Sequence, residues 1–236
     1  MKKYGRRILL ALLAVIVLAV GGFLLYTSDY YRADPDALLV MDNSGSVVTQ
    51  DNTITLTPDD ETDTGIIFYP GAKVEYTSYL PLLQKLQQRG YLCVLVQMPF
   101  NLAILDINAA EGVFSQHPEI EHWILAGHSL GGAMASSYLS DHPETADGLI
   151  LLGAYVYGNV PVEDTLVLYG SEDRVLDRAK LSGGDNEVEI EGGNHAQFGN
   201  YGAQAGDGTA TISAEEQQNI AVEKIDEFIK QLSVKE

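Results

Sequence analysis

Short apolar runs alternate with amphipathic segments along the chain from Gly65 onward. Each run is apolar at consecutive positions, which is typical of a strand in a parallel sheet covered on both faces. The segments between the runs carry apolar residues three and four positions apart, as helices do. The pattern predicts an α/β fold with helices on both faces of a mostly parallel sheet. The expected strands are Ile66–Tyr69, Leu92–Gln97, Trp123–Ala126, Leu149–Leu152, Leu166–Tyr169 and Glu187–Ile190. The expected helices are Tyr79–Gln88, Ala103–Ser115, Gly131–Ser140 and a short one at Val175–Leu181.

Three short β-rich segments precede Gly65, and turn residues at 42–45 and 51–52 separate them. They predict an antiparallel beginning to the sheet. The segments are Leu38–Met41, Val47–Gln50 and Thr53–Thr57.

The C-terminal part predicts one further helix. Ser213 and Glu216 have the spacing of a capping box, and apolar residues at helical spacing follow them. Only about a dozen residues lie between the strand ending at Leu152 and the one starting near Leu166, too few for a lid domain. We therefore expect residues 33–236 to form one domain without a lid.

A stretch of 19 uncharged residues, Ile8–Tyr26, lies near the N-terminus. A helix of that length matches the ~30 Å hydrocarbon core of a bilayer. Four basic residues precede the stretch and acidic sequence follows it, so the positive-inside bias places the remainder of the chain outside the cytoplasm. We expect residues 1–32 to be a basic tip and a transmembrane signal anchor. A cleaved signal peptide is the alternative, in which case the domain is secreted.

The charge balance argues against polyanionic partners. The first 26 residues hold four of the 14 Lys and Arg and none of the 33 Asp and Glu, so residues 27–236 carry a net charge of −23. Such a domain repels nucleic acid and anionic lipid surfaces.

Cys93 is the one cysteine, which excludes an intrachain disulfide and zinc sites built on paired cysteines. We expect no metal or organic cofactor, and we interpret Gly206–Thr209 as a turn rather than an ion-binding loop.

Ser129 lies in a Gly-x-Ser-x-Gly motif, Gly127–Gly131, between a predicted strand and a predicted helix. In a nucleophile elbow the serine occupies a strained turn, and glycines flank it because larger side chains would collide with the strand and helix. The motif alone is common by chance, and its strand-to-helix context is what favours an elbow. A glycine-rich helix start with a capping serine is the structural alternative.

A serine nucleophile needs a histidine base and an acid, which follow it in the order acid, histidine in such folds. His195 is the one histidine after Ser129 in a suitable loop, beyond the strand ending at Ile190. Asp173 follows the strand ending at Tyr169 and is our candidate for the acid that orients His195. The acids that remain as alternatives are Glu172, Asp177, Glu163 and Asp164.

The negative oxygen formed during acyl transfer needs two hydrogen-bond donors. The first expected donor is the backbone N–H of Leu130, the residue after the nucleophile. The second comes from the loop after an early strand, where Pro70 and Gly71 shape a tight turn. We expect it to be the N–H of Ala72, with that of Lys73 as second choice.

These motifs together resemble the α/β-hydrolase superfamily and, more narrowly, a bacterial group of small dienelactone-hydrolase-like serine hydrolases. The resemblance covers about residues 35–235 and is carried by four loops: 69–75, 127–132, 170–173 and 192–199. It implies an α/β-hydrolase fold and a Ser-His-Asp hydrolase of esters or related acyl compounds. Dienelactone hydrolases proper use a cysteine nucleophile, whereas here the elbow holds Ser129 and Cys93 lies within a strand. A dienelactone substrate is therefore not expected, and Pro70-Gly71 replaces the usual His-Gly oxyanion signature.

The sequence predicts a membrane-anchored, extracytoplasmic serine hydrolase that cleaves a small acyl substrate through an acyl-enzyme. Without a lid the site should be open and should favour short acyl groups over lipids that need a deep apolar tunnel. Two other functions remain open. One is a catalytically silent binding module, and the other is an acyltransferase that uses an alcohol of the cell envelope in place of water.

Overall fold

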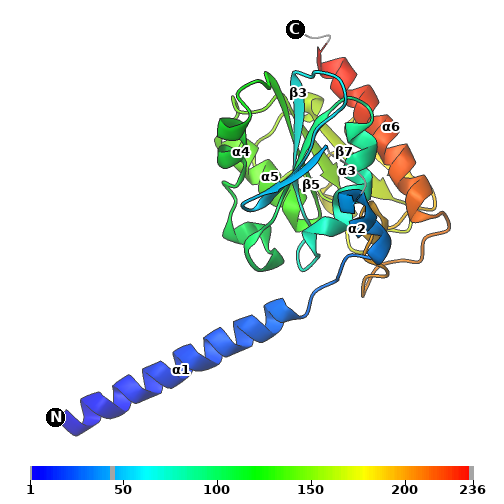
Figure 1. Cartoon of the computed structure of the whole chain (residues 1–236). Coiled ribbons are helices and arrows are strands. Elements are labelled where there is room, and N and C mark those ends of the chain that lie inside the picture. The colour runs from blue at the N-terminus through cyan, green and yellow to red at the C-terminus, as the bar shows by residue number, and fades with distance from the viewer. Residues whose placement is uncertain (1, 43–45, 234–236) are drawn as a thin grey trace. The chain divides into compact units, whose positions relative to one another are not determined.

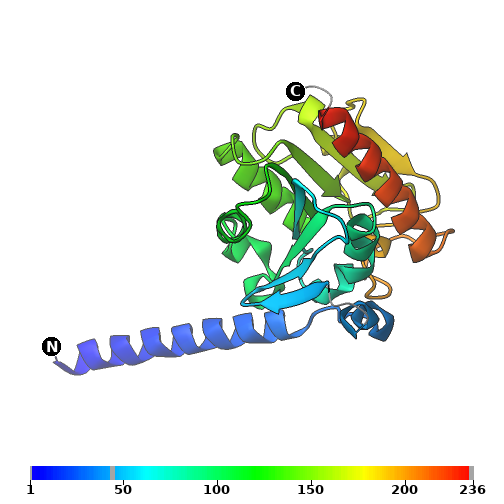
Figure 2. The same cartoon turned by 45° about the horizontal axis from the view of Figure 1, so that its top comes forward.

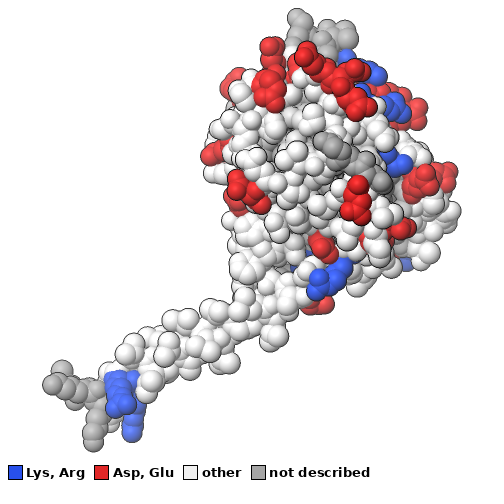
Figure 3. Space-filling view, viewed as in Figure 1, with Lys and Arg blue, Asp and Glu red and all other residues white. Residues whose placement is uncertain are grey.

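The computed structural model describes residues 2–42 and 46–233 and divides the chain into two compact units, Met1–Tyr30 and Tyr31–Glu236. The first unit is the helix α1 (Lys2–Ser28), dark blue in Figure 1. In Figure 3 this helix is white apart from basic residues near its N-terminal end. Its segment Tyr4–Ser28, 25 residues long, is long and apolar enough to cross a bilayer, and a signal sequence meets the same criteria. The predicted N-terminal apolar helix is therefore present.

An eight-stranded sheet forms the centre of the second unit, in the order β1-β2-β4-β3-β5-β6-β7-β8. β2 pairs with β1 and β4 in antiparallel fashion, and all other neighbours are parallel. The mostly parallel sheet predicted from the sequence is confirmed. The strands are β1 (Val47–Gln50), β2 (Thr53–Leu56), β3 (Thr64–Tyr69), β4 (Leu92–Val96), β5 (His122–His128), β6 (Gly148–Leu152), β7 (Thr165–Gly170) and β8 (Glu187–Ile190).

Helices cover both faces of the sheet (Figures 1 and 2). One face carries α3 (Leu80–Gln87) and α6 (Ala214–Ser233), and the other carries α4 (Ala110–Gln116) and α5 (Leu130–Asp141). In β3, Ile66 and Phe68 belong to the first of the two core clusters, whereas Ile67 and Tyr69 belong to the second. Because both faces of the strand are buried, its sequence is a continuous apolar run.

The C-terminal helix α6 begins where the sequence predicts. The hydroxyl of Ser213 accepts a hydrogen bond from the N–H of Glu216 at 3.1 Å, which satisfies a free donor of the first turn. Buried residues along α6, such as Ile225 and Phe228, pack against the sheet.

The segment Leu38–Met41 is helical rather than a strand. It lies within α2 (Pro35–Asp42), which begins with a proline, a residue whose fixed φ suits the first helical position. Ala37 and Val40, three positions apart, are the buried residues of this helix. Burial of this pair in the domain favours a helix, although the composition of the segment favours a strand. Most of the turn expected at 42–45 lies outside the described residues.

The predicted helix Ala103–Ser115 is broken into two pieces. Phe100 and Asn101 have positive φ values of 53° and 55°, a one-turn helix follows at Ala103–Leu105, and α4 starts only at Ala110. The buried Tyr69 hydroxyl accepts a hydrogen bond from the N–H of Ala110 and donates one to the carbonyl of Ile107. This long-range anchor holds the intervening loop away from helical geometry.

The predicted helix Val175–Leu181 is reduced to a single turn at Arg178–Lys180. The N–H groups of Val175 and Leu176 donate to a carboxylate oxygen of Asp173 at 2.8 and 2.9 Å. Because the Asp173 side chain accepts from these two N–H groups, the chain forms a turn at Val175 and Leu176, and helical structure begins only at Arg178. Between β6 and β7, residues 153–164 contain one single-turn helix, Val162–Asp164, and the described residues form no lid.

Glycines allow α5 to begin unusually close to β3 and β5. A Cβ atom on Gly127 would lie 2.6 Å from the backbone nitrogen of Gly132, and one on Gly131 would overlap the carbonyl oxygens of Tyr69 and Pro70. These are contacts with backbone, which cannot move aside as a flexible side chain can. The glycines predicted at the elbow are therefore required by packing.

We predict that Gly131→Ala lowers the free energy of unfolding by at least about 2 kcal/mol, because the added methyl group forces backbone apart. Gly112→Ala is the matched control: Gly112 lies in α4 with nothing within 4 Å of the added Cβ. That change should stabilise the domain by about 0.5–1 kcal/mol, as alanine does in a helix interior. Urea unfolding followed by the fluorescence of Trp123, the one tryptophan, measures both. Equal effects of the two substitutions would contradict the packing argument.

Candidate active site

Ser129 occupies a strained turn between the end of β5 and the start of α5. Its backbone has φ 52° and ψ −123°, a conformation that is costly for a residue with a side chain. Two hydrogen bonds hold the turn: the N–H of Ser129 donates to the carbonyl of Leu152, and its carbonyl accepts from Ala133. The side chain stays partly exposed at the carboxyl edge of the sheet. This is the geometry of a nucleophile elbow.

Asp173 and His195 form a buried pair. Oδ2 of Asp173 lies 2.9 Å from Nδ1 of His195, and the two side chains are 0% and 1% exposed. They arrive on separate loops, Asp173 after β7 and His195 after β8. A carboxylate can only accept, so Nδ1 of His195 carries the hydrogen and Nε2 is left as the acceptor. Burial by itself raises the pKa of Asp173, but the hydrogen bond and charge of His195 and the N–H donors of Leu176 and Val175 lower that pKa below its usual value.

The structure does not form a hydrogen bond between Ser129 and His195. Nε2 of His195 is buried and has no hydrogen-bond partner among the described residues. The His195 ring nevertheless lies next to the segment that holds the Ser129 turn. A Cβ on Gly153, which follows the Leu152 that binds the Ser129 N–H, would lie 2.7 Å from Nδ1 of His195. An unpartnered acceptor nitrogen is what a base for a serine hydroxyl needs.

The alternative acids do not reach His195. Asp177 accepts a hydrogen bond from the N–H of Ala179 and caps the short helix that follows it. Glu163 and Asp164 lie before β7 begins, at the opposite end of that strand from Asp173. Glu172 is adjacent to Asp173, but the hydrogen bond to His195 is made by Asp173.

The two expected oxyanion donors have no hydrogen-bond acceptor among the described residues. Within the described part of the chain, no group accepts a hydrogen bond from the backbone N–H of Ala72 or from that of Leu130, in the first turn of α5. The N–H of Lys73, the second choice, donates to the carbonyl of Asn101 at 2.8 Å and is not available. The N–H of Gly71 likewise donates to the hydroxyl of Tyr79. Ala72 is therefore the remaining donor of this loop.

A buried chain of hydrogen bonds runs from Gly71 through Tyr79 and His128 to the backbone of His195. The Tyr79 hydroxyl accepts from Gly71, so it donates to Nδ1 of His128 at 2.8 Å. Nε2 of His128 then carries the hydrogen and donates to the carbonyl of His195 at 3.1 Å. The His128 and His195 rings lie 4.5 Å apart. Burial, followed by the neighbouring His195, lowers the pKa of His128 well below its usual value, so His128 is neutral.

Asp207 holds the same loop from the other side. Its carboxylate accepts hydrogen bonds from the N–H groups of Ala196, Gly208 and Arg174 at 2.9, 2.8 and 3.3 Å. It thereby joins the loop of His195 to the loop of Asp173. Sequence reasoning assigned Asp207 to a plain turn and placed Tyr79 in a helix without a role, because no local spacing signals partners so far away along the chain.

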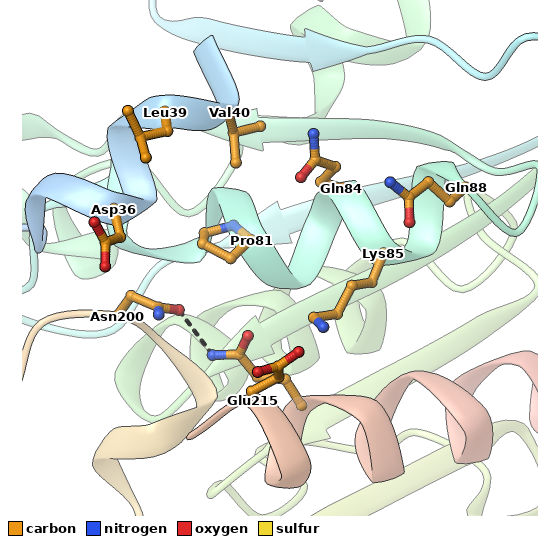
Figure 4. A pocket seen from close by; sticks show the side chains of 10 residues that line it. Asp36, Leu39, Val40, Pro81, Gln84, Lys85, Gln88, Asn200 and Glu215 are labelled. Atoms are coloured by element: carbon orange, nitrogen blue, oxygen red, sulfur yellow. Dashed lines mark hydrogen bonds between the residues drawn. The ribbon is translucent and has the colours of Figure 1, made fainter. Parts of the chain in front are cut away.

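Cys93 and the hollow in Figure 4 lie apart from this site. Cys93 is fully buried within β4, and burial raises the pKa of its thiol, so it is not an exposed nucleophile. The hollow, of about 430 Å³, is lined by α2, α3 and the start of α6, with Asp36, Lys85 and Glu215 among its charged residues. No candidate catalytic side chain lines it. The described residues hold no cluster of His, Cys, Asp and Glu that suits a metal ion.

Solved structures with a similar fold include several hydrolases. The monoacylglycerol lipase of Paleococcus ferrophilus is 12% identical over 76% of this chain and 100% of that one, with a TM-score of 0.56. Carboxyl esterase 2 of the fungus Tuber melanosporum is 13% identical over 80% and 87% of the two chains, with a TM-score of 0.56. For Est1E of Butyrivibrio proteoclasticus the values are 13%, 80%, 98% and 0.54. At these identities the likeness concerns the fold.

Comparison of sequences gives information on the family in addition to the fold. No curated protein matches the chain. The Alpha/beta hydrolase family matches residues 65–219, which include the elbow, the Asp173 loop and the His195 loop. This match spans more than half of the chain, and the chain belongs to the alpha/beta hydrolase family.

Proposed function

We propose that this hydrolase cleaves an ester or related acyl bond with Ser129 as nucleophile, His195 as base and Asp173 as the residue that orients the base. The observation that carries the proposal is the buried Asp173–His195 pair, whose Nε2 has no hydrogen-bond partner among the described residues and whose ring lies 4.5 Å from that of His128, the residue before the strained Ser129. Family membership supports hydrolase chemistry. The narrower resemblance to small dienelactone-hydrolase-like serine hydrolases belongs to the same proposal.

The first half-reaction transfers the acyl group to Ser129. The Ser129 hydroxyl gives its proton to Nε2 of His195 as its oxygen attacks the acyl carbonyl. The N–H groups of Ala72 and Leu130 bind the negative oxygen of the tetrahedral intermediate. His195 then protonates the departing alcohol, and Ser129 keeps the acyl group. Asp173, with its lowered pKa, stays ionised at neutral pH and stabilises the imidazolium.

The second half-reaction returns the free enzyme. His195 takes a proton from water, the hydroxide attacks the acyl carbonyl on Ser129, and the serine oxygen leaves with the proton that His195 returns. These steps use side chains and backbone alone, so the mechanism calls for no cofactor.

His128 and Tyr79 are positioning residues in this proposal. His128 contacts the carbonyl of His195 and not its reactive Nε2, and Tyr79 acts through Nδ1 of His128. A neutral His128 donates a hydrogen bond to that carbonyl without placing a second positive charge beside the imidazolium, which would oppose the reaction.

The proposal also includes the setting of the enzyme. Residues 1–32 serve as a basic tip and signal anchor, and residues 33–236 form the catalytic domain on the outer side of the membrane. The length and apolar composition of α1 support an anchor, and the basic residues before it support this orientation.

We predict that Ser129→Ala abolishes covalent labelling by a fluorophosphonate probe. The same change should lower kcat/KM for a short-chain ester at least about 1,000-fold, because the acyl-enzyme cannot form. Ser115→Ala, an exposed serine of α4, is the matched control and should keep both activities. Well-folded wild-type protein that is not labelled would instead favour a silent binding module.

Asp173→Asn should lower kcat by about 10,000-fold with little effect on the fold, because an amide can donate to Nδ1 and so favours the wrong tautomer of His195. Asp177→Asn tests the nearby acid and should retain activity within about tenfold, since its carboxylate serves a local cap. Steady-state kinetics on a soluble ester measures both variants. A larger loss for Asp177→Asn would remove Asp173 from the proposed triad.

The neutral His128 predicts a loss of stability in acid. Below pH ~6.5 the unfolded chain protonates this histidine while the folded chain resists, so the free energy of unfolding falls as the pH falls. Between pH 7.5 and 5.5 His128 contributes a loss of about 1.4 kcal/mol, which His128→Gln should lack. Urea unfolding at the two pH values measures the difference. The amide can still donate to the His195 carbonyl, so kcat at pH 8 should stay within about tenfold of wild type. Equal acid sensitivity of the two proteins would contradict the assignment.

A further inference from the structure

A loop at the carboxyl edge of the sheet exposes large apolar side chains. Phe100, Ile104 and Leu105 are 51%, 55% and 49% exposed. They belong to residues 98–105, here called the apolar loop, which follows β4 and contains no charged residue. The carboxyl ends of parallel strands share one edge, so the apolar loop lies on the same edge as Ser129, Asp173 and His195. A cluster of exposed large apolar side chains marks an interaction surface.

Hydrogen bonds link the apolar loop to the candidate oxyanion segment and to the start of the domain. The N–H of Lys73, next to Ala72, donates to the carbonyl of Asn101, and the carbonyl of Lys73 accepts from the N–H of Tyr31, both at 2.8 Å. Tyr31 also accepts from the N–H of Glu75 and forms a parallel bridge with Val74. Lys73 therefore links the apolar loop to Tyr31, where the chain enters the domain.

Tyr31 is firmly held at this edge. Its hydroxyl accepts a hydrogen bond from the N–H of Ala205 at 2.9 Å, and its ring lies 5.6 Å from that of Tyr201. The next residues are tied down as well, since the N–H of Ala33 donates to the carboxylate of Glu75. Releasing Tyr31 and Ala33 to lengthen the connection to α1 would break these contacts.

The connection between the apolar helix and Tyr31 is very short. α1 ends at Ser28, and Asp29 and Tyr30 are the two residues between. Three steps of extended chain reach about 10 Å. If α1 spans a bilayer, Tyr31 stays within about that distance of the helix end, whatever direction the helix takes. The bilayer is then a large apolar partner close to the segment that holds the apolar loop.

We propose that the carboxyl edge of the domain faces the bilayer surface, with the apolar loop in the interface, and that the enzyme takes amphiphilic esters held in that bilayer. This inference rests on the proposed function and names its substrate class. The acyl chain of such a substrate can stay among the lipids while its carbonyl reaches Ser129, so an open site without a tunnel suffices. Charged residues of both signs lie next to the entry point, namely Arg32 in sequence and Lys73 and Glu75 through their hydrogen bonds to Tyr31 and Ala33, and the domain is acidic overall (Figure 3). The surface therefore suits uncharged or zwitterionic lipids rather than anionic ones.

Site-specific fluorescence in the full chain tests the contact with lipid. Cys93 is buried, so an environment-sensitive thiol dye reacts selectively with Leu105→Cys or with the control Val162→Cys, whose native residue is 43% exposed. The wild type measures background labelling. In phosphatidylcholine vesicles we expect blue-shifted emission at position 105 that brominated phosphatidylcholine quenches, and neither effect at position 162. A blue shift without quenching assigns the loop to a protein partner such as a second copy of the chain, and that result, or no change at position 105, overturns the inference.

Kinetics of the full chain tests the substrate class. The variant Phe100→Asn, Ile104→Ser, Leu105→Ser removes the apolar side chains, with asparagine chosen because it tolerates the positive φ at position 100. We expect at least about a tenfold lower rate on a long-chain ester in phosphatidylcholine vesicles and less than about a twofold change on a water-soluble short-chain ester. The control variant Val48→Ser, Val162→Ser also removes exposed apolar residues and should change neither rate.

The two proposals fail in different ways. Wild-type protein that hydrolyses the soluble ester but not the vesicle ester, or a triple variant that loses neither or both rates equally, overturns the interfacial inference and leaves the proposed function standing. A Ser129 that reacts with no ester and no fluorophosphonate overturns the proposed function, and with it the substrate class.

Discussion

Asp173 is a carboxylate that the fold removes from water, and a buried charge is tolerated only where hydrogen bonds replace its hydration. Three donors do so here: Nδ1 of His195 and the N–H groups of Val175 and Leu176. Each requirement shapes a different part of the edge. The imidazole must approach from the loop after β8, and the chain after Asp173 must turn back on itself instead of continuing as a helix. The satisfaction of one carboxylate thus determines the path of two loops and the tautomer of the base.

The base is held from two further directions. His128, neutral and buried, reaches the backbone of His195 from within the elbow, while Asp207 reaches the next residue from the loop at 201–213. Tyr79 extends the first of these contacts to Gly71, next to the candidate oxyanion donor Ala72. The nucleophile turn, the base and the oxyanion loop are therefore joined by one buried set of hydrogen bonds. Such preorganisation limits the motion of groups that must meet a short-lived charge.

The part of the fold from Gly65 onward was predictable because burial on both faces of a strand leaves a continuous apolar run, and the five strands β3 to β7 carry one. The edge strand β8 alternates charged and apolar residues instead. The errors have physical causes. Burial of Ala37 and Val40 makes a helix of a β-rich segment, and positive φ values at Phe100 and Asn101, with an anchor from Tyr69, interrupt a helical pattern. For the site, the order of Ser129, Asp173 and His195 along the chain identified the candidates. Tyr79 and Asp207 could not be identified, because the contacts that join them to the site, to His128 and to Ala196, span more than ten positions of the chain. Neither residue carries a local sequence signal of such a contact.

The docking of Tyr31 also bears on where the folded domain begins. Its backbone supplies two hydrogen bonds to the segment 73–75, which is continuous with Ala72. A soluble fragment that starts at Ala33 would leave the carbonyl of Lys73 and the N–H of Glu75 without these partners, beside one of the two donors that the chemistry calls for. A fragment that starts at Asp29 would keep them. Truncation within the residues next to the apolar helix thus acts on the oxyanion loop itself, and an inactive short fragment would report a damaged loop rather than a missing membrane.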